Sequence, residues 1–116
     1  MDVFAVTLAE VRAAWQQEAP DHVIGFAQTP GWCPLAAYLN GRTPGTTHFV
    51  RAEGIYACPP GQVTIEEDTP QFAAPAWVMP FMALIDSEAE RYCAPVTAQR
   101  ALAVLERVER DYPDTV

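Results

Sequence analysis

The segment from Pro30 to Leu39 restricts the fold of this chain more than any other. Proline is favoured at the first position of a helix and disfavours helical geometry at the residue before it. We therefore expect a helix that begins at Pro34, with Cys33 as its N-cap residue. Asn40-Gly41 predicts the end of this helix, because both residue types tolerate the left-handed conformation found there.

Two further helices have clear terminal signals. Thr7 and Glu10 have the spacing of a capping box, which predicts a helix from about Leu8 to Glu18. Thr97 is the expected N-cap of a final helix that ends before Pro113. These two helices lie at opposite ends of the chain.

The middle of the chain predicts a β-hairpin and a fourth helix. Thr46 to Ala57 is rich in β-branched and aromatic residues, and Gln62 to Glu66 alternates polar and apolar side chains. We expect these segments to pair across Pro59-Pro60-Gly61, and Val23 to Ala27 is the candidate for a third strand. The apolar spacing after Pro80 predicts the remaining helix.

The element order predicts one α+β domain over residues 1–116, arranged helix, helix, β-hairpin, helix, helix. Half of the 116 residues are hydrophobic, which is enough for a proper core. A chain of this length should bury about two-thirds of the surface that it exposes when unfolded. We therefore expect it to fold without a partner.

The net charge of the chain restricts the kinds of molecule that it can bind. Fifteen acidic residues face seven arginines and no lysine, for a formal net charge of −8. Such a surface repels phosphate backbones and anionic membranes, so direct binding to nucleic acid or to a membrane is disfavoured. A protein partner with a basic surface remains, and an acidic mimic of nucleic acid is one form of this hypothesis. Solubility by itself also accounts for a charge of this size.

The N-terminus and the cysteines indicate the compartment. No apolar run approaches the roughly 20 residues that cross a bilayer, and Met1-Asp2-Val3-Phe4 lacks the basic region of a signal peptide. We therefore expect a cytoplasmic protein, in which Cys33, Cys58 and Cys93 are free thiols by default. One disulfide among the three stays open from sequence alone.

A thiol site is one hypothesis for function. The dipole and the free N–H groups at a helix N-terminus lower the pKa of a thiol, and Cys33 has this setting. His48 follows on the next predicted strand, so Cys33 as nucleophile and His48 as base would form a thiol-dependent hydrolase or transferase. Asp86 or Glu53 are the candidates to orient the imidazole. The competing interpretation makes Cys33 a structural cap or a buried small side chain, and His48 a surface histidine.

Other site classes are disfavoured by spacing. Cys33, His48, Cys58 and Cys93 contain no compact pair of zinc ligands, and the chain has no glycine-rich nucleotide motif and no serine-hydrolase motif. We expect no cofactor and no metal. The acidic run from Glu66 to Asp68 predicts a solvated turn, because it lacks the glycine-bearing spacing of a calcium loop.

Trp32 is the candidate binding residue. It lies in a loop rich in proline and glycine, whereas Trp15 and Trp77 are expected in the core. Exposed aromatic side chains anchor interfaces, so Trp32 either covers the edge of the core or contacts a partner or a second copy. Small size, acidity and the lack of catalytic motifs favour a protein-binding module over an enzyme.

Three segments carry a family pattern: Cys33 to Leu39, with Cys-Pro-Leu-Ala; the Trp-led apolar stretch Trp77 to Asp86; and the Thr-capped start Thr97 to Leu102. Together they resemble a group of small uncharacterised bacterial and phage-associated proteins. The resemblance implies a small stand-alone domain. It implies no activity, so no functional residue is transferred from it.

Overall fold

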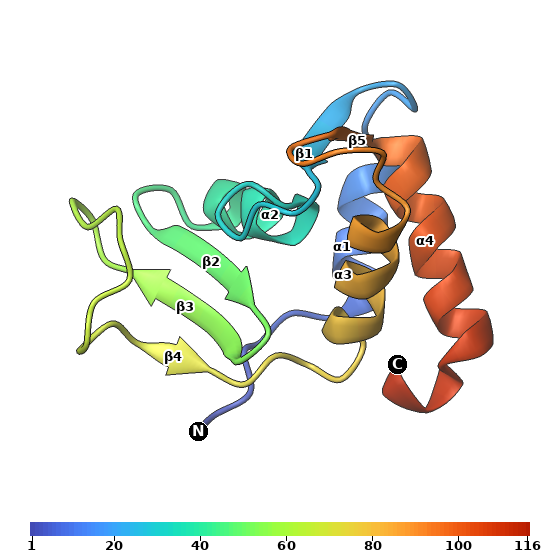
Figure 1. The fold of residues 1–116 in the computed structure, drawn as a ribbon. Helices are drawn as coiled ribbons and strands as arrows, with labels where there is room; N and C mark the ends of the chain where they lie inside the picture. Colours follow the sequence, from blue (N-terminus) through green and yellow to red (C-terminus); the bar gives the residue numbers. More distant parts are fainter.

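Four α-helices and five β-strands make up the computed structural model, which describes residues 1–116 (Figure 1). The elements are α1 (Leu8–Gln16), β1 (Val23–Phe26), α2 (Pro34–Arg42), β2 (Thr47–Arg51), β3 (Gly54–Cys58), β4 (Gln71–Phe72), α3 (Val78–Ser87), β5 (Pro95–Thr97) and α4 (Ala98–Asp111), followed by a 3₁₀ helix (Pro113–Thr115). The strands form two antiparallel sheets, β1-β5 and β2-β3-β4. The predicted α+β class is confirmed.

The helix starts follow the local signals. The Thr7 hydroxyl accepts a hydrogen bond from the Glu10 N–H at 3.1 Å, and the Glu10 carboxylate accepts one from the Thr7 N–H at 2.8 Å. This complete capping box starts α1 as predicted, and α1 ends at Gln16. Thr97 caps α4 in the predicted way by accepting from the Arg100 N–H at 3.2 Å.

The end of α2 differs from the prediction. Asn40 and Gly41 continue the helix to Arg42, and the chain leaves it at Thr43, with φ −126° and ψ 80°. Thr43 precedes Pro44, and the residue before a proline is disfavoured in the helical region. Proline therefore decides where α2 stops, and the Asn40 side chain is left for another role.

The hairpin in the structure is formed by other segments than the sequence predicted. β2 and β3 both come from the stretch expected to be one strand, and Gln62 to Glu66 forms a loop. Gly54 explains the turn, because its φ of 146° is open to glycine and the Phe72 carbonyl oxygen lies 2.4 Å from where a Cβ would be. The third strand of this sheet is β4, and Val23 to Ala27 does not join it.

The segment expected as a third strand belongs to a second sheet. β1 pairs with β5, a three-residue strand that begins with proline and carries too weak a pattern to predict. The Ala27 N–H donates to the Ala94 carbonyl at 2.8 Å, and the Ala98 N–H donates to the His22 carbonyl at 2.9 Å. This sheet therefore connects the loop that precedes α2 to the start of α4.

The third helix begins two residues earlier than expected. α3 starts at Val78, which puts Pro80 in the first turn, where an N–H has no partner within the helix. Proline is therefore tolerated there without a lost hydrogen bond. None of the helices is both long and apolar enough to cross a membrane.

The core lies where the helices meet one face of the β2-β3-β4 sheet. α1, α3 and α4 pack on one side of the molecule, the sheet lies on the other, and α2 lies between them (Figure 1). Phe81 is central, with ring-centroid distances of 5.7 Å to Trp15 and 6.0 Å to Trp77. Both tryptophans are buried, as predicted.

Candidate functional site

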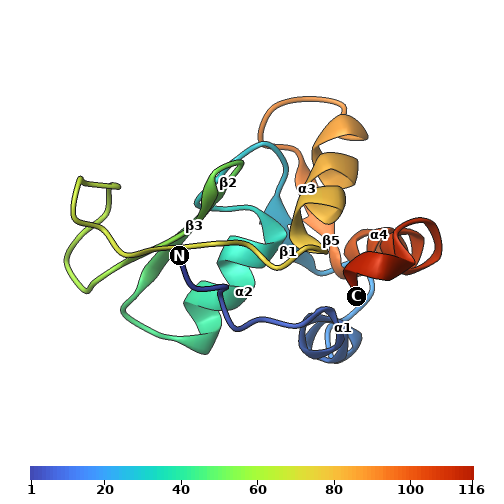
Figure 2. The same ribbon diagram turned by 90° about the horizontal axis from the view of Figure 1, so that it is seen from below.

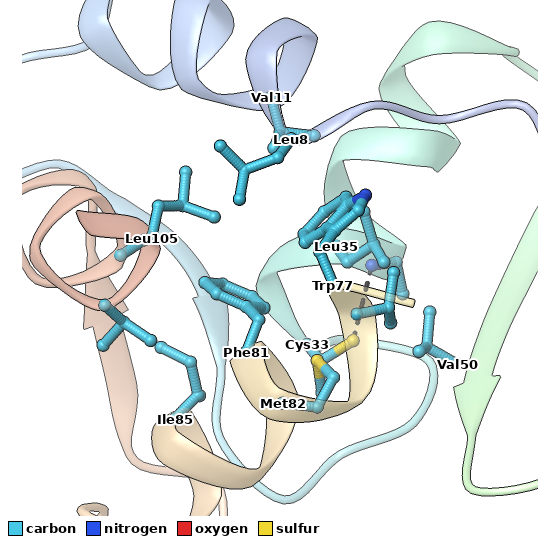
Figure 3. Packing of buried hydrophobic residues seen from close by; sticks show 14 of the residues in the cluster. Leu8, Val11, Cys33, Leu35, Val50, Trp77, Phe81, Met82, Ile85 and Leu105 are labelled. Carbon is cyan, nitrogen blue, oxygen red and sulfur yellow. Dashed lines mark hydrogen bonds between the residues drawn. The ribbon is translucent and has the colours of Figure 1, made fainter. Parts of the chain in front are cut away.

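Cys33 occupies the predicted N-cap of α2, but its thiol is fully buried. Sγ accepts a hydrogen bond from the Ala36 N–H at 3.4 Å and lies 3.8 Å from the Pro30 carbonyl oxygen. Figure 3 shows this side chain within the apolar cluster, with the dashed bond to the helix backbone. Burial raises the pKa of Cys33 to about 12, outweighing the backbone N–H groups that lower it.

His48 lies on the first strand after α2, as predicted, but only 2% of its surface is exposed. The expectation of a surface histidine is therefore wrong. Its backbone N–H and its Nδ1 lie 2.7 and 2.9 Å from Asn40 Oδ1. Because this oxygen accepts from the backbone, Nδ1 must carry a proton to share it. Burial, together with nearby Arg42, lowers the pKa of His48 and favours the neutral ring.

The structure does not join Cys33 and His48. The imidazole is bound to Asn40, which lies about 10 Å along the helix axis from the N-cap position. Asp86 and Glu53 make their hydrogen bonds to other residues, so neither orients His48. These contacts support the capping and packing role of Cys33.

Trp32 projects into solvent, with 68% of its surface exposed. Its backbone is nevertheless held at both ends. The Trp32 N–H donates to the Thr29 carbonyl at 3.2 Å, and the Trp32 carbonyl accepts from the Phe26 N–H at 2.7 Å. The indole therefore does not cover the edge of the core, while the loop that carries it is fixed.

The rest of this loop is tied to two other elements. Gln28 has a φ of 61°, and its N–H donates to the Asp86 carboxylate on α3 at 2.8 Å. The Gln28 amide also donates to the Asp86 carbonyl at 3.1 Å. On the other side, the Val50 N–H of β2 donates to the Pro30 carbonyl at 3.0 Å. The loop thus bridges α3 and the sheet.

The β2-β3-β4 sheet has one face without a helix. Side chains alternate along a strand, and the register pairs Val50 with Ile55 on the core face and Phe49 with Tyr56 on the opposite face. Figure 2 shows α2 on one side of β2 and β3 and no helix on the other side. We call this second side the outer face; it carries Thr47, Phe49, Arg51, Tyr56, Cys58 and Gln71.

The outer face and the Trp32 loop are continuous. A Cβ on Gly31 would lie 2.9 Å from Cε1 of Phe49, so the loop backbone sits against that ring. Phe49 and Tyr56 are half-buried, and the Tyr56 hydroxyl donates to the Glu53 carboxylate at 3.1 Å. Two aromatic side chains therefore share the outer face, and the loop backbone that carries Trp32 lies against one of them.

The connection from β3 to β4, Pro59 to Pro70, projects from the end of the sheet (Figure 1); we call it the acidic loop. The buried Thr69 hydroxyl hydrogen-bonds two other residues of the loop. Cys58 Sγ lies 3.6 Å from the Thr64 carbonyl oxygen, so the loop folds over the end of the outer face. Glu66 to Asp68 are exposed on it.

Most of the arginines form ion pairs within the chain. Six of the seven arginines form ion pairs with carboxylates of the same chain. None of these pairs involves the acidic loop, whose carboxylates are free of basic partners. The six are Arg12, Arg42, Arg51, Arg100, Arg107 and Arg110.

The three cysteines are unpaired, which settles the disulfide left open by the sequence; Cys33 and Cys58 are buried and Cys93 is exposed. No group of three or more histidine, cysteine, aspartate or glutamate side chains gathers in an arrangement that would hold a metal ion.

Sequence reasoning did not assign Phe49 and Tyr56 to a site. The signal in the sequence is Glu53-Gly54, a turn within the segment Thr46 to Ala57. Placing the turn there pairs Phe49 with Tyr56 and puts both on one face. The role of Asn40 had no such signal, because it depends on the position of β2.

Comparison with protein-family models, with curated proteins and with solved structures finds no match. Function is therefore argued from the geometry of this chain. Its most distinctive site is the exposed Trp32 on a fixed loop beside the outer face.

Proposed function

We propose that this protein is a small acidic binding module that recognises another protein through Trp32. The observation that carries the proposal is the contrast between an indole that is 68% exposed and a loop backbone bound to β1, β2 and α3. Tryptophan is enriched among the residues that dominate the binding energy of interfaces. The proposal includes a cytoplasmic location, in keeping with three unpaired cysteines.

The fixed loop supports the proposal energetically. A side chain on a mobile segment loses conformational entropy when it binds, which weakens the complex. Here Gln28, Thr29 and Pro30 already hold the loop through hydrogen bonds. Binding would then order little more than the indole itself.

The structure bears differently on the two alternative functions, a thiol-dependent enzyme and an acidic mimic of nucleic acid. The thiol-dependent enzyme receives no support from Cys33, whose thiol is buried and has a raised pKa, or from His48, which is bound to Asn40. The acidic mimic of nucleic acid differs from the proposal only in the identity of the partner. Identifying the partner therefore decides between the mimic and other binding modules.

Photo-crosslinking tests the proposal directly. A photoreactive phenylalanine analogue replaces Trp32 in one variant and Tyr92 in a control, since Tyr92 is 71% exposed in a different loop. After irradiation in lysate of the source cells, we expect a defined protein adduct from position 32 and none of that mass from position 92. Equal adducts at both positions would show that Trp32 is not a recognition residue.

A substitution provides the second measurement. Trp32→Ala removes the anchor without opening the core, so the fold should be unchanged by circular dichroism. Loss of a hot-spot tryptophan weakens a complex by about 30-fold or more. We expect that loss for the crosslinked partner, and a loss of less than about threefold for Tyr92→Ala.

A further inference from the structure

We propose that the outer face, bordered by Trp32 and by the acidic loop, docks a basic segment of the partner protein in which lysine or arginine alternates with apolar side chains. This inference rests on the proposed function and adds the chemistry of the partner. It goes beyond Trp32 because it assigns the sheet face and the loop to one surface.

The apolar part of the surface is made by aromatic rings. Phe49 and Tyr56 lie side by side across β2 and β3, and the backbone at Gly31, next to Trp32, lies against the Phe49 ring. No helix lies on this side of β2 and β3 (Figure 2). An occupant must therefore supply apolar side chains to bury these rings.

The charge of the surface identifies the occupant. Glu66, Glu67 and Asp68 form no ion pair with any arginine of the chain. Their loop meets the end of the outer face where Cys58 Sγ lies 3.6 Å from the Thr64 carbonyl oxygen. The one arginine on the outer face, Arg51, is already paired with Glu53 at 3.6 Å. The unsatisfied charge beside the rings is negative, so a complementary occupant is cationic.

A second copy of the chain fits this surface poorly. Two copies would each bring a net charge of −8 and an acidic loop to the same contact. Opposed like charges cost binding energy and slow association. A heterologous basic segment removes this conflict and gains three carboxylate partners.

The test uses the full chain and a defined probe. The probe is a short fluorescein-labelled peptide that alternates lysine with valine and phenylalanine; the control peptide has glutamate in place of lysine. Binding is followed by anisotropy, and tryptophan emission reports burial of Trp32, because Trp15 and Trp77 are already buried. We expect saturable binding and an emission shift to shorter wavelength with the lysine peptide, weakened by salt, and neither with the glutamate peptide.

Two triple variants with the same change in net charge separate the acidic loop from general electrostatics. Glu66→Gln, Glu67→Gln and Asp68→Asn neutralise the loop. The control neutralises exposed acids elsewhere that have no ion pair, with the substitutions Asp21→Asn, Glu106→Gln and Asp114→Asn. We expect the loop variant to lose about fivefold to tenfold in affinity and the control less than about twofold.

Tyr56→Ser tests the aromatic part of the surface, and circular dichroism checks that the variant is folded. We expect its affinity for the lysine peptide to fall by about fivefold or more. Equal losses from the two triple variants, or equal binding of the two peptides, would overturn the inference. So would a dimer in sedimentation that Trp32→Ala dissociates, since it assigns the surface to a second copy. If position 32 crosslinks a protein while the lysine peptide does not bind, the proposed function stands and the inference is wrong.

Discussion

One oxygen atom of Asn40 accepts two hydrogen bonds from His48, from its backbone N–H at 2.7 Å and from its ring at 2.9 Å. The bonds join the last turn of α2 to the first residues of β2 across a part-buried contact. They also hold the imidazole edge-on to Phe4, with ring centroids 5.7 Å apart. His48 is thus a structural link between helix and sheet.

Asn40→Ala should destabilise the protein by about 2–4 kcal/mol, because two donors of buried His48 lose their acceptor at once. Urea unfolding of the variant measures this change. Asn40→Asp keeps an acceptor oxygen in place and should recover at least half of the loss. A cost below about 0.5 kcal/mol for Asn40→Ala would mean that water replaces the amide.

Stability should decrease as the pH falls below the ordinary histidine range. Burial lowers the pKa of His48 in the folded state, so the unfolded chain binds a proton more readily. The contribution of His48 is fully present above about pH 6.5 and is lost as the pH falls toward its lowered folded pKa. Urea unfolding from about pH 7.5 to about pH 5.5 covers this window and stays above the range in which carboxylates titrate.

The matched variants for this pH profile are His48→Gln and His22→Gln. His48→Gln retains a side-chain N–H for Asn40 and should flatten the profile. His22 is the other histidine of the chain, exposed directly before β1, and His22→Gln is the matched control. The same slope in both variants would show that His48 does not control the pH dependence.

The three thiols should label with iodoacetamide in an order set by burial. Cys93 is exposed and should react first, whereas Cys33 and Cys58 are buried and have raised pKa values. The thiolate is the reacting form, so Cys33 should be protected until the protein unfolds. Peptide mass spectrometry of native and urea-unfolded samples resolves the sites. Native labelling of Cys33 as fast as that of Cys93 would restore the hypothesis of a reactive thiol.

Gly25→Ala should prevent stable folding or cost more than about 3 kcal/mol. A Cβ at this position would lie 2.5 Å from the Pro34 nitrogen and 2.7 Å from its Cα, and a backbone cannot move aside as a flexible side chain does. β1 therefore crosses the start of α2 only with glycine here.

Gly41→Ala is the matched control for that substitution. Gly41 lies inside α2, and a Cβ there meets no atom within 4 Å. Alanine in place of a helical glycine is stabilising by about 0.5–1 kcal/mol. Thermal unfolding should therefore shift in opposite directions for the two glycines, and a loss of stability with Gly41→Ala would contradict the helical assignment.

The helix starts could be read from the sequence because they are decided within a few residues. Thr7 with Glu10, Cys33 before Pro34, and Thr97 each satisfy free N–H groups of the turn that follows them. The end of α2 was misplaced for a related reason: Pro44 was a stronger local signal than Asn40-Gly41. The α+β class follows from these elements.

Strand pairing could not be read in the same way. β4 and β5 are two and three residues long, and each exists only because another segment supplies its hydrogen bonds. Val23 to Ala27 shows this most clearly, since its sequence predicts a strand and only the fold selects β5 as its neighbour. Short strands carry too few residues for periodicity to identify a partner.

By itself, the sequence determined where the helices begin, the acidic charge and the presence of Cys33, His48 and Trp32 as candidate residues. Only the tertiary structure decided their chemical state: Cys33 buried with a raised pKa, His48 bound to Asn40, and Trp32 left in solvent. The reason is physical. Capping depends on the nearest backbone groups, whereas burial and pKa depend on which distant segments cover a side chain and keep water from it.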